Sequence, residues 1–274
     1  MTLKTRNSLT RYIFIVSLAI IAAHIATVIT AIVTKSVVPP TGLRPLVIAD
    51  SFVLTRYDFT AVLASITMLT LYVPLALFLV LRLFENTQSV EVIFFCGALV
   101  GCLCESTRFI IPLFGIWQSY STLLFFLSRI VFAGRMMVPL FFFAAATLCD
   151  GEQRQNVERN FSIVLALATV IASAIPMNTA QTTTACMVTE GFEPMPTIIR
   201  ILLFIITGAV FYINGKKHDS PELNKISFFY IFVATGYLCL TIADNFLFMG
   251  LGTIFLYAGS AQFLRNLHRL YMWK

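Results

Sequence analysis

The sequence predicts an all-α protein, a polytopic membrane helix bundle of about eight transmembrane helices with both termini cytoplasmic. Of its 274 residues, 58% are hydrophobic and 12% are charged, whereas a soluble domain usually carries about 25% charged residues. Apolar stretches of roughly 20 residues recur along nearly the whole chain, and each is long enough to cross a hydrocarbon core about 30 Å thick. Residues 1–274 are therefore expected to form a single integral membrane domain.

Most of the predicted helices follow one another with short connections, but two loops, roughly residues 34–58 and 178–196, are longer. The first follows Lys4, Arg6 and Arg11 and superficially resembles a signal peptide. Its apolar run of about 22 residues exceeds the 7 to 15 of a signal-peptide core, so we expect it to remain as a signal anchor. The predicted spans are residues 12–33, 59–81, 90–114, 120–148, 161–177, 197–213, 226–246 and 250–267.

Lysine and arginine are distributed unequally between the two sides of these helices. One side carries Lys4, Arg6, Arg11, Arg82, Arg154, Arg159, Lys216, Lys217, Lys225, Arg265, Arg269 and Lys274. The other side carries Lys35, Arg44 and Arg56. Since basic residues concentrate in cytoplasmic loops, this bias predicts that both termini are cytoplasmic. The expected location is the plasma membrane or a bacterial inner membrane.

Several site types are not expected from this sequence. It contains no Walker A sequence and no dinucleotide-binding fingerprint. The cysteines form no C-x-x-C site, and Cys102 and Cys104 point in different directions on a predicted helix. Three dispersed histidines offer no metal-ligand spacing. We therefore expect no metal, no cofactor and no nucleic-acid partner.

The most informative residues are charged side chains within the apolar segments. Such a group costs roughly 2.5 to 3.5 kcal/mol at the centre of a membrane helix. We therefore expect these side chains to face the interior of the bundle, toward its outer half. They are Glu105, Arg108, Arg129, Arg135, Arg200 and Asp244.

A buried ion pair is the most specific structural prediction. The segments 90–114 and 120–148 are joined by a very short turn, so residues equally far from that turn lie at similar depth. This count places Glu105 level with Arg129 and predicts that the two pair, with Arg108 on the same helix face as Glu105. Arg135 is deeper, and we expect it to lie beyond the reach of Glu105 unless the helices are offset.

The charged groups suggest a binding site for an anion. Four arginines and two carboxylates leave an excess of positive charge, and a guanidinium offers a planar fork suited to carboxylate or phosphate oxygens. Arg108, Arg129 and Arg200 are the candidate ligands in an outward-opening cavity. A purely structural reading, in which Glu105, Arg129, Arg135 and Asp244 form a network that fixes the helix register, stays open beside it.

Three functions remain open at this level. The leading one is a non-enzymatic membrane sensor, ligand-binding or interaction module, without catalytic residues. It would bind an anionic small molecule or lipid, or a membrane or cytoplasmic protein partner, besides the lipid bilayer. The first alternative is a small transporter for an anionic solute or lipid, and the second is an intramembrane lipid-modifying enzyme.

Overall fold

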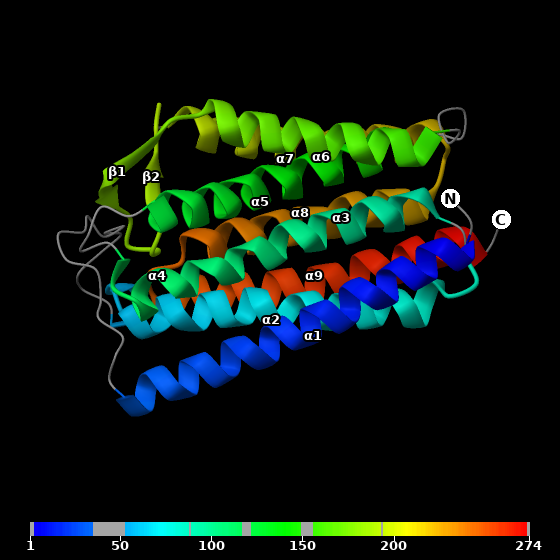
Figure 1. Cartoon of the computed structure of the whole chain (residues 1–274). Helices are drawn as coiled ribbons and strands as arrows, with labels where there is room; N and C mark the ends of the chain where they lie inside the picture. Colours follow the sequence, from blue (N-terminus) through cyan, green and yellow to red (C-terminus); the bar gives the residue numbers. More distant parts are fainter. Residues whose placement is uncertain are drawn as a thin grey trace.

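The computed structural model describes residues 3–34, 53–87, 89–116, 122–148, 156–192 and 194–272. It is 86% helical. Within these residues, eight helices are long and apolar enough to cross a membrane (Figure 1). The predicted all-α bundle with about eight helices of membrane-spanning length is confirmed.

The helices extend past the predicted spans at most of their ends. Their bounds are α1 (Leu3–Thr34), α2 (Phe59–Phe84), α3 (Val90–Cys104), α4 (Ile110–Leu113), α5 (Thr122–Thr147), α6 (Val157–Ala174), α7 (Met195–Lys217), α8 (Pro221–Ile242) and α9 (Phe246–Met272). Two 3₁₀ helices, η1 (Val53–Thr55) and η2 (Glu105–Phe109), and two strands, β1 (Met177–Thr182) and β2 (Val188–Glu190), complete the described elements. The segment α3–η2–α4 serves as one membrane-length helix.

Short polar residues begin several helices. Asp58 caps α2 by accepting from the backbone N–H of Thr60 at 2.8 Å, and Ser220 accepts from the N–H of Leu223 at 3.4 Å to start α8. These caps satisfy backbone N–H groups that have no partner within the first helical turn. The local sequence therefore marks the starts of both helices.

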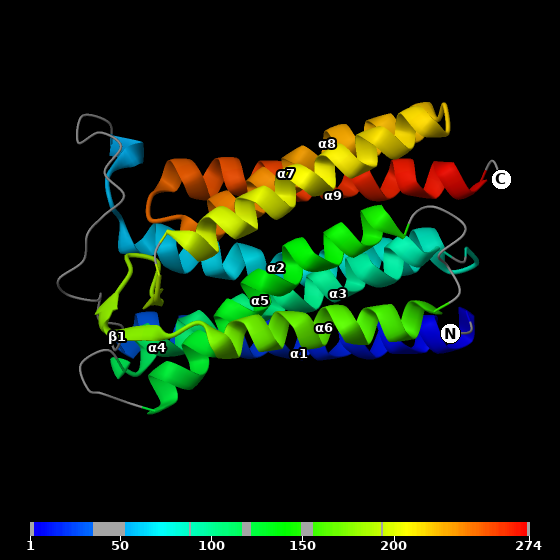
Figure 2. The same ribbon diagram turned by 90° about the horizontal axis from the view of Figure 1, so that it is seen from above.

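Six helices form a closed ring, in which each packs against the next in the order α2, α3, α5, α7, α8 and α9, and α9 returns to α2 (Figures 1 and 2). The hydroxyl groups of Tyr72 on α2 and Ser260 on α9 lie 2.7 Å apart and link the two closing helices. Helices α1 and α6 lie outside the ring, against α2 and α5 respectively. Their large exposed apolar faces suit contact with lipid.

Aromatic side chains fill the centre of the ring near one end of the bundle. We call this group the aromatic layer: Phe95, Phe142, Phe211, Tyr230 and Phe263, from five different helices. Ring centroids of contacting pairs are 5.2 to 6.1 Å apart. Each side chain is buried. The ring is thus closely packed at this level.

Glycines allow two pairs of helices to approach closely. A Cβ atom on Gly134 of α5 would lie 2.5 Å from the carbonyl oxygen of Gly101 on α3. Between α8 and α9, a Cβ on Gly252 would lie 2.8 Å from Leu240 and one on Gly259 would lie 2.9 Å from Phe232. Gly252 and Gly259 of α9 therefore serve contacts within the chain.

The start of α1 and the end of α9 lie at the same end of the bundle, which we call the termini end (Figure 1). The antiparallel hairpin of β1 and β2 lies at the opposite end, which we call the hairpin end. A tight turn joins the strands, in which the N–H of Thr183 donates to the carbonyl of Met187 at 2.7 Å and the N–H of Cys186 to that of Thr183 at 3.1 Å. Residues 183–187 are called the hairpin loop below.

Candidate functional site

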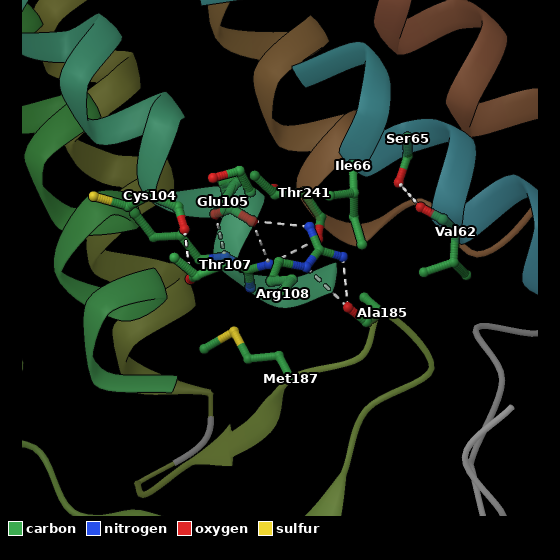
Figure 3. A network of polar contacts seen from close by, with 12 residues as sticks. Val62, Ser65, Ile66, Cys104, Glu105, Thr107, Arg108, Ala185, Met187 and Thr241 are labelled. Carbon is green, nitrogen blue, oxygen red and sulfur yellow. Dashed lines mark hydrogen bonds and ion pairs between the residues drawn. The ribbon is translucent and has the colours of Figure 1, made fainter. Parts of the chain in front are cut away.

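Glu105 lies where the helical segment changes from α to 3₁₀ geometry. The carboxylate is fully buried and accepts hydrogen bonds from two arginines, one on its own segment and one on α5. A buried carboxylate without such partners would be very unfavourable in an apolar interior. Glu105 is therefore the centre of a polar network at the hairpin end of the ring (Figure 3).

Arg108 connects Glu105 to the hairpin loop. Its Nη1 donates to Oε2 of Glu105 at 2.8 Å, while Nε and Nη2 both donate to the carbonyl oxygen of Ala185, at 2.9 and 2.5 Å. Figure 3 shows the guanidinium extending between these two groups. Arg108 is completely buried, so the loop covers the face of the guanidinium that points away from Glu105.

Arg135 connects the same carboxylate to the end of α8. Its Nε donates to Oε1 of Glu105 at 2.8 Å, and its Nη2 donates to the carbonyl oxygen of Thr241 at 2.9 Å. Thr241 is in the last turn of α8, where carbonyl groups have no partner within the helix. A cation is also favourable near a helix C-terminus.

One carboxylate thus joins four separate segments: η2, α5, the hairpin loop and the end of α8. We call Glu105, Arg108 and Arg135 the central triad. Two guanidinium groups share one carboxylate, which leaves a formal excess of one positive charge. The backbone carbonyl oxygens of Ala185 and Thr241 carry partial negative charge and accept hydrogen bonds from the other sides of the two guanidinium groups. Such a network is stable only while every member keeps its partners.

The predicted pair between Glu105 and Arg129 is wrong, because Glu105 pairs with Arg135 instead. The depth count itself was close, since Gly101 faces Gly134 across the two helices. However, side chains on a helix lean toward its N-terminus. The N-terminus of α5 is at the hairpin end, so the long side chain of Arg135 reaches back to the level of Glu105.

Arg129 is directed toward a different helix. Its Nη1 donates to the carbonyl oxygen of Ala172 on α6, and its guanidinium carbon lies 4.7 Å from the centroid of the Phe125 ring. Arg135 follows Arg129 by six positions, which turns the side chain by about 240° around the helix. Among the described residues, its buried Nε has no acceptor. Arg129 is therefore separate from the central triad.

Arg200 and Asp244 hold the hairpin at two other points. Nη2 of Arg200 on α7 lies 3.1 Å from Oε2 of Glu190 on β2, and both side chains are buried. Asp244, in the turn between α8 and α9, accepts from the hydroxyl of Thr184 at 3.3 Å. Two of the three candidate anion ligands, Arg108 and Arg200, thus bind the same hairpin.

Cys186 anchors the tip of the hairpin loop. It is fully buried and packs with Ala31, Val62, Ile66 and Phe109. Its φ of 56° lies in the left-handed region that non-glycine residues rarely adopt, so surrounding contacts must hold it there. Burial raises the pKa of its thiol to about 12.

Tyr57 lies beside the loop, just before α2. Burial, together with the nearby Cys186 and Asp244, raises the pKa of its phenol to about 12. The surroundings of the hairpin loop therefore favour neutral side chains over new negative charge. An anion entering here would need the arginines as direct partners.

The sequence did not indicate the residues of the hairpin that complete the site. Glu190 is the partner of Arg200, and the backbone carbonyl of Ala185 is the second partner of Arg108. The sequence signal that could have identified Glu190 is its carboxylate, which lies in the loop that precedes Arg200. A backbone carbonyl leaves no signal in the sequence.

Within the described ranges, no group of three histidine, cysteine or acidic residues is arranged to hold a metal ion. With Glu190 added, the six groups chosen from sequence become a set of four arginines and three carboxylates, whose positive excess is smaller. Comparison of the chain with protein-family models and with curated proteins finds no match.

Proposed function

We propose that the protein is a non-enzymatic membrane sensor module, in which an anionic ligand and the hairpin loop compete for Arg108. The hairpin end faces outward, and the termini end lies in the cytoplasm. The basic residues assigned to the inner side support this orientation. The membrane is a plasma membrane or a bacterial inner membrane.

The observation that carries the proposal is the position of the Ala185 carbonyl oxygen. It occupies the Nε and Nη2 side of Arg108, the same fork that binds a carboxylate or phosphate through two parallel hydrogen bonds. A charged acceptor makes stronger hydrogen bonds to a guanidinium than a neutral carbonyl does. A small anion that reached this fork would release the hairpin loop.

The central triad would carry that change to the helices. Glu105 holds Arg108 and Arg135 together, and Arg135 holds the end of α8 through Thr241. A shift of Arg108 toward a ligand would weaken its hydrogen bond to Glu105. Because Arg135 shares the same carboxylate, its interaction with Glu105 would change as well. A sensor requires such differential contacts in its two states.

The packing supports a sensor over a transporter. The aromatic layer fills the centre of the ring between the central triad and the termini end. A transport pathway along the ring axis would have to displace these five large side chains. A cytoplasmic or membrane protein partner would receive the signal at the termini end.

The test is a thermal-shift screen of small carboxylates and phosphates on the purified protein. A ligand at one hundred times its dissociation constant adds about 2.7 kcal/mol of stability. We expect a subset of anions to raise the melting temperature of the wild type and to have no effect on Arg108→Gln. Arg269→Gln, an exposed arginine in the last turn of α9 at the termini end, is the matched control and should respond as the wild type does.

The alternatives give different results. A transporter would accumulate the same anion in sealed proteoliposomes, and a lipid-modifying enzyme would change a lipid substrate in detergent without any gradient. If no anion stabilises the wild type, or if Arg108→Gln responds fully, the proposed competition at Arg108 is wrong.

A further inference from the structure

A second charged site lies at the termini end, between the first two helices. A cavity of about 280 Å³ is lined by Asn7, Arg11, Phe78, Leu81, Arg82 and Glu85. It is far from the central triad, since α1 begins and α2 ends at the termini end. Its lining combines charged groups and apolar side chains, which is the composition needed to hold an amphipathic molecule.

Positive charge predominates in this cavity. Nη2 of Arg11 lies 3.2 Å from Oε1 of Glu85, with both side chains mostly exposed. Arg82 has no ion-pair partner among the residues described here. Lys4 lies on the same face of α1 as Asn7 and Arg11, because the three are spaced by three and four residues. One carboxylate therefore faces two guanidinium groups, with an ammonium group nearby.

The walls of the cavity are fixed by backbone contacts. The side-chain amide of Asn7 donates to the carbonyl oxygen of Glu85 at 2.8 Å. Beside it, Nη1 of the buried Arg6 donates to the carbonyl oxygen of Thr87 at 2.5 Å. These bonds hold the start of α1 against the end of α2, so the cavity is a stable feature of this junction.

The apolar side of the cavity lies nearer to the midpoint of the bundle's long axis than the charged side does. Phe78 is half exposed and precedes Arg82 by one helical turn, about 6 Å along α2. The headgroup region of a bilayer is roughly 5 to 7 Å deep on each side of the hydrocarbon core. The spacing between Arg82 and Phe78 along α2 thus matches the distance from a lipid headgroup to the start of its acyl chains.

We propose that this cavity binds an anionic phospholipid. Arg11 and Arg82 hold the phosphate group, and the acyl chains lie along Phe78 and Leu81. Arginine suits this role because its planar fork forms two hydrogen bonds to one phosphate. The proposal is independent of any ligand at the hairpin end, since the two sites share no residue.

Native mass spectrometry of the purified full-length protein can test this site. The probes are dioleoyl phosphatidylglycerol, dioleoyl phosphatidylcholine and free glycerol phosphate, each titrated in the same detergent. We expect phosphatidylglycerol to bind about tenfold more tightly than phosphatidylcholine. The double variant Arg11→Gln, Arg82→Gln should lose most of this preference. The charge-matched variant Arg265→Gln, Arg269→Gln, at exposed positions of α9, should keep it.

Three results would overturn the proposal. The first is equal binding of the two lipids by the wild type. The second is an equal loss of preference in both double variants, which would indicate a general effect of net charge. The third is free glycerol phosphate binding as tightly as the lipid, which would identify a soluble anion. Phe78→Ser, which leaves the arginines intact, should weaken the lipid and leave glycerol phosphate unchanged.

Discussion

Arg135 of α5 donates from its Nε to Oε1 of Glu105 at 2.8 Å, and this contact joins α5 to η2, the 3₁₀ segment that continues α3. The pairing depends on the direction of the arginine side chain, which extends toward the N-terminus of α5. It also depends on Gly101 and Gly134, whose missing side chains let the helices approach. Backbone packing and charge pairing therefore reinforce each other.

Removal of either partner of this contact should destabilise the protein strongly. Breaking a buried ion pair costs about 3 to 5 kcal/mol, because one charge is left without compensation. We expect Glu105→Gln and Arg135→Met to be strongly non-additive, with the double variant less destabilised than the sum of the single variants. The measurement is the free energy of unfolding in mixed micelles.

The matched control for this cycle is Arg129→Met. Arg129 makes its hydrogen bond to α6, so its effect should add to that of Glu105→Gln within about 0.5 kcal/mol. Strong coupling of Glu105 to Arg129, with additivity between Glu105 and Arg135, would show that Arg129 and not Arg135 is the partner of Glu105.

The close approach of α3 and α5 predicts that alanine substitutions at Gly134 and Gly250 differ strongly in their effect on stability. A Cβ on Gly134 would collide with the backbone oxygen of Gly101, and overpacking of this kind costs about 1 to 3 kcal/mol. A Cβ on Gly250 of α9 meets nothing within 4 Å, so Gly250→Ala should be neutral or stabilise the helix by up to about 1 kcal/mol. Melting temperatures of both variants measure this; equal effects would contradict the observed helix spacing.

The burial of Cys186 predicts a loss of stability at alkaline pH. Its pKa is raised from an ordinary value of 9.0 to about 12 in the folded protein. The unfolded chain therefore releases the thiol proton first, and stability falls as pH rises from about 9 toward 12. Between pH 9 and pH 10 the expected loss is about 1 kcal/mol.

The comparison for this prediction is Cys186→Ala. Tyr57, whose pKa is also raised to about 12, mainly by burial, stays in both proteins and contributes nearly equally between pH 9 and pH 10. The difference in unfolding free energy between wild type and variant should therefore shrink as pH rises through this range. A difference that stays constant with pH would mean that the thiol is not buried in the folded state.

The number of helices followed from the sequence because long apolar runs are a direct consequence of the bilayer thickness. The interior position of Glu105, Arg108 and Arg200 followed from the cost of exposing charge to lipid, and all three are buried. Their partners required information on side-chain direction. A simple depth count selects Arg129, whereas the lean of the side chains selects Arg135.

The hairpin was not predicted, and most of the candidate site depends on it. Residues 178–196 have the composition of a loop, with a polar run that gives no clear strand pattern. The hairpin is held at three points, by Arg108 and Asp244 at its loop and by Arg200 at β2. Tertiary contacts of this kind override weak local preferences.

The accessibility of Cys186 tests most directly whether Arg108 holds the hairpin loop closed. The protein is treated with a maleimide at pH 7, and the modification of each cysteine is followed by mass spectrometry of its peptides. In the wild type, Cys186 should react slowly, because the loop must open before the reagent reaches the buried thiol.

Arg108→Gln should increase the labelling rate of Cys186 by about tenfold to a hundredfold, since hydrogen bonds to a charged group contribute about 1.5 to 3 kcal/mol. Arg269→Gln should leave the rate unchanged, and the buried Cys102 of α3 reports on global unfolding in every sample. If Cys186 reacts equally fast in the wild type and in Arg108→Gln, while Cys102 stays protected, Arg108 does not hold the hairpin loop.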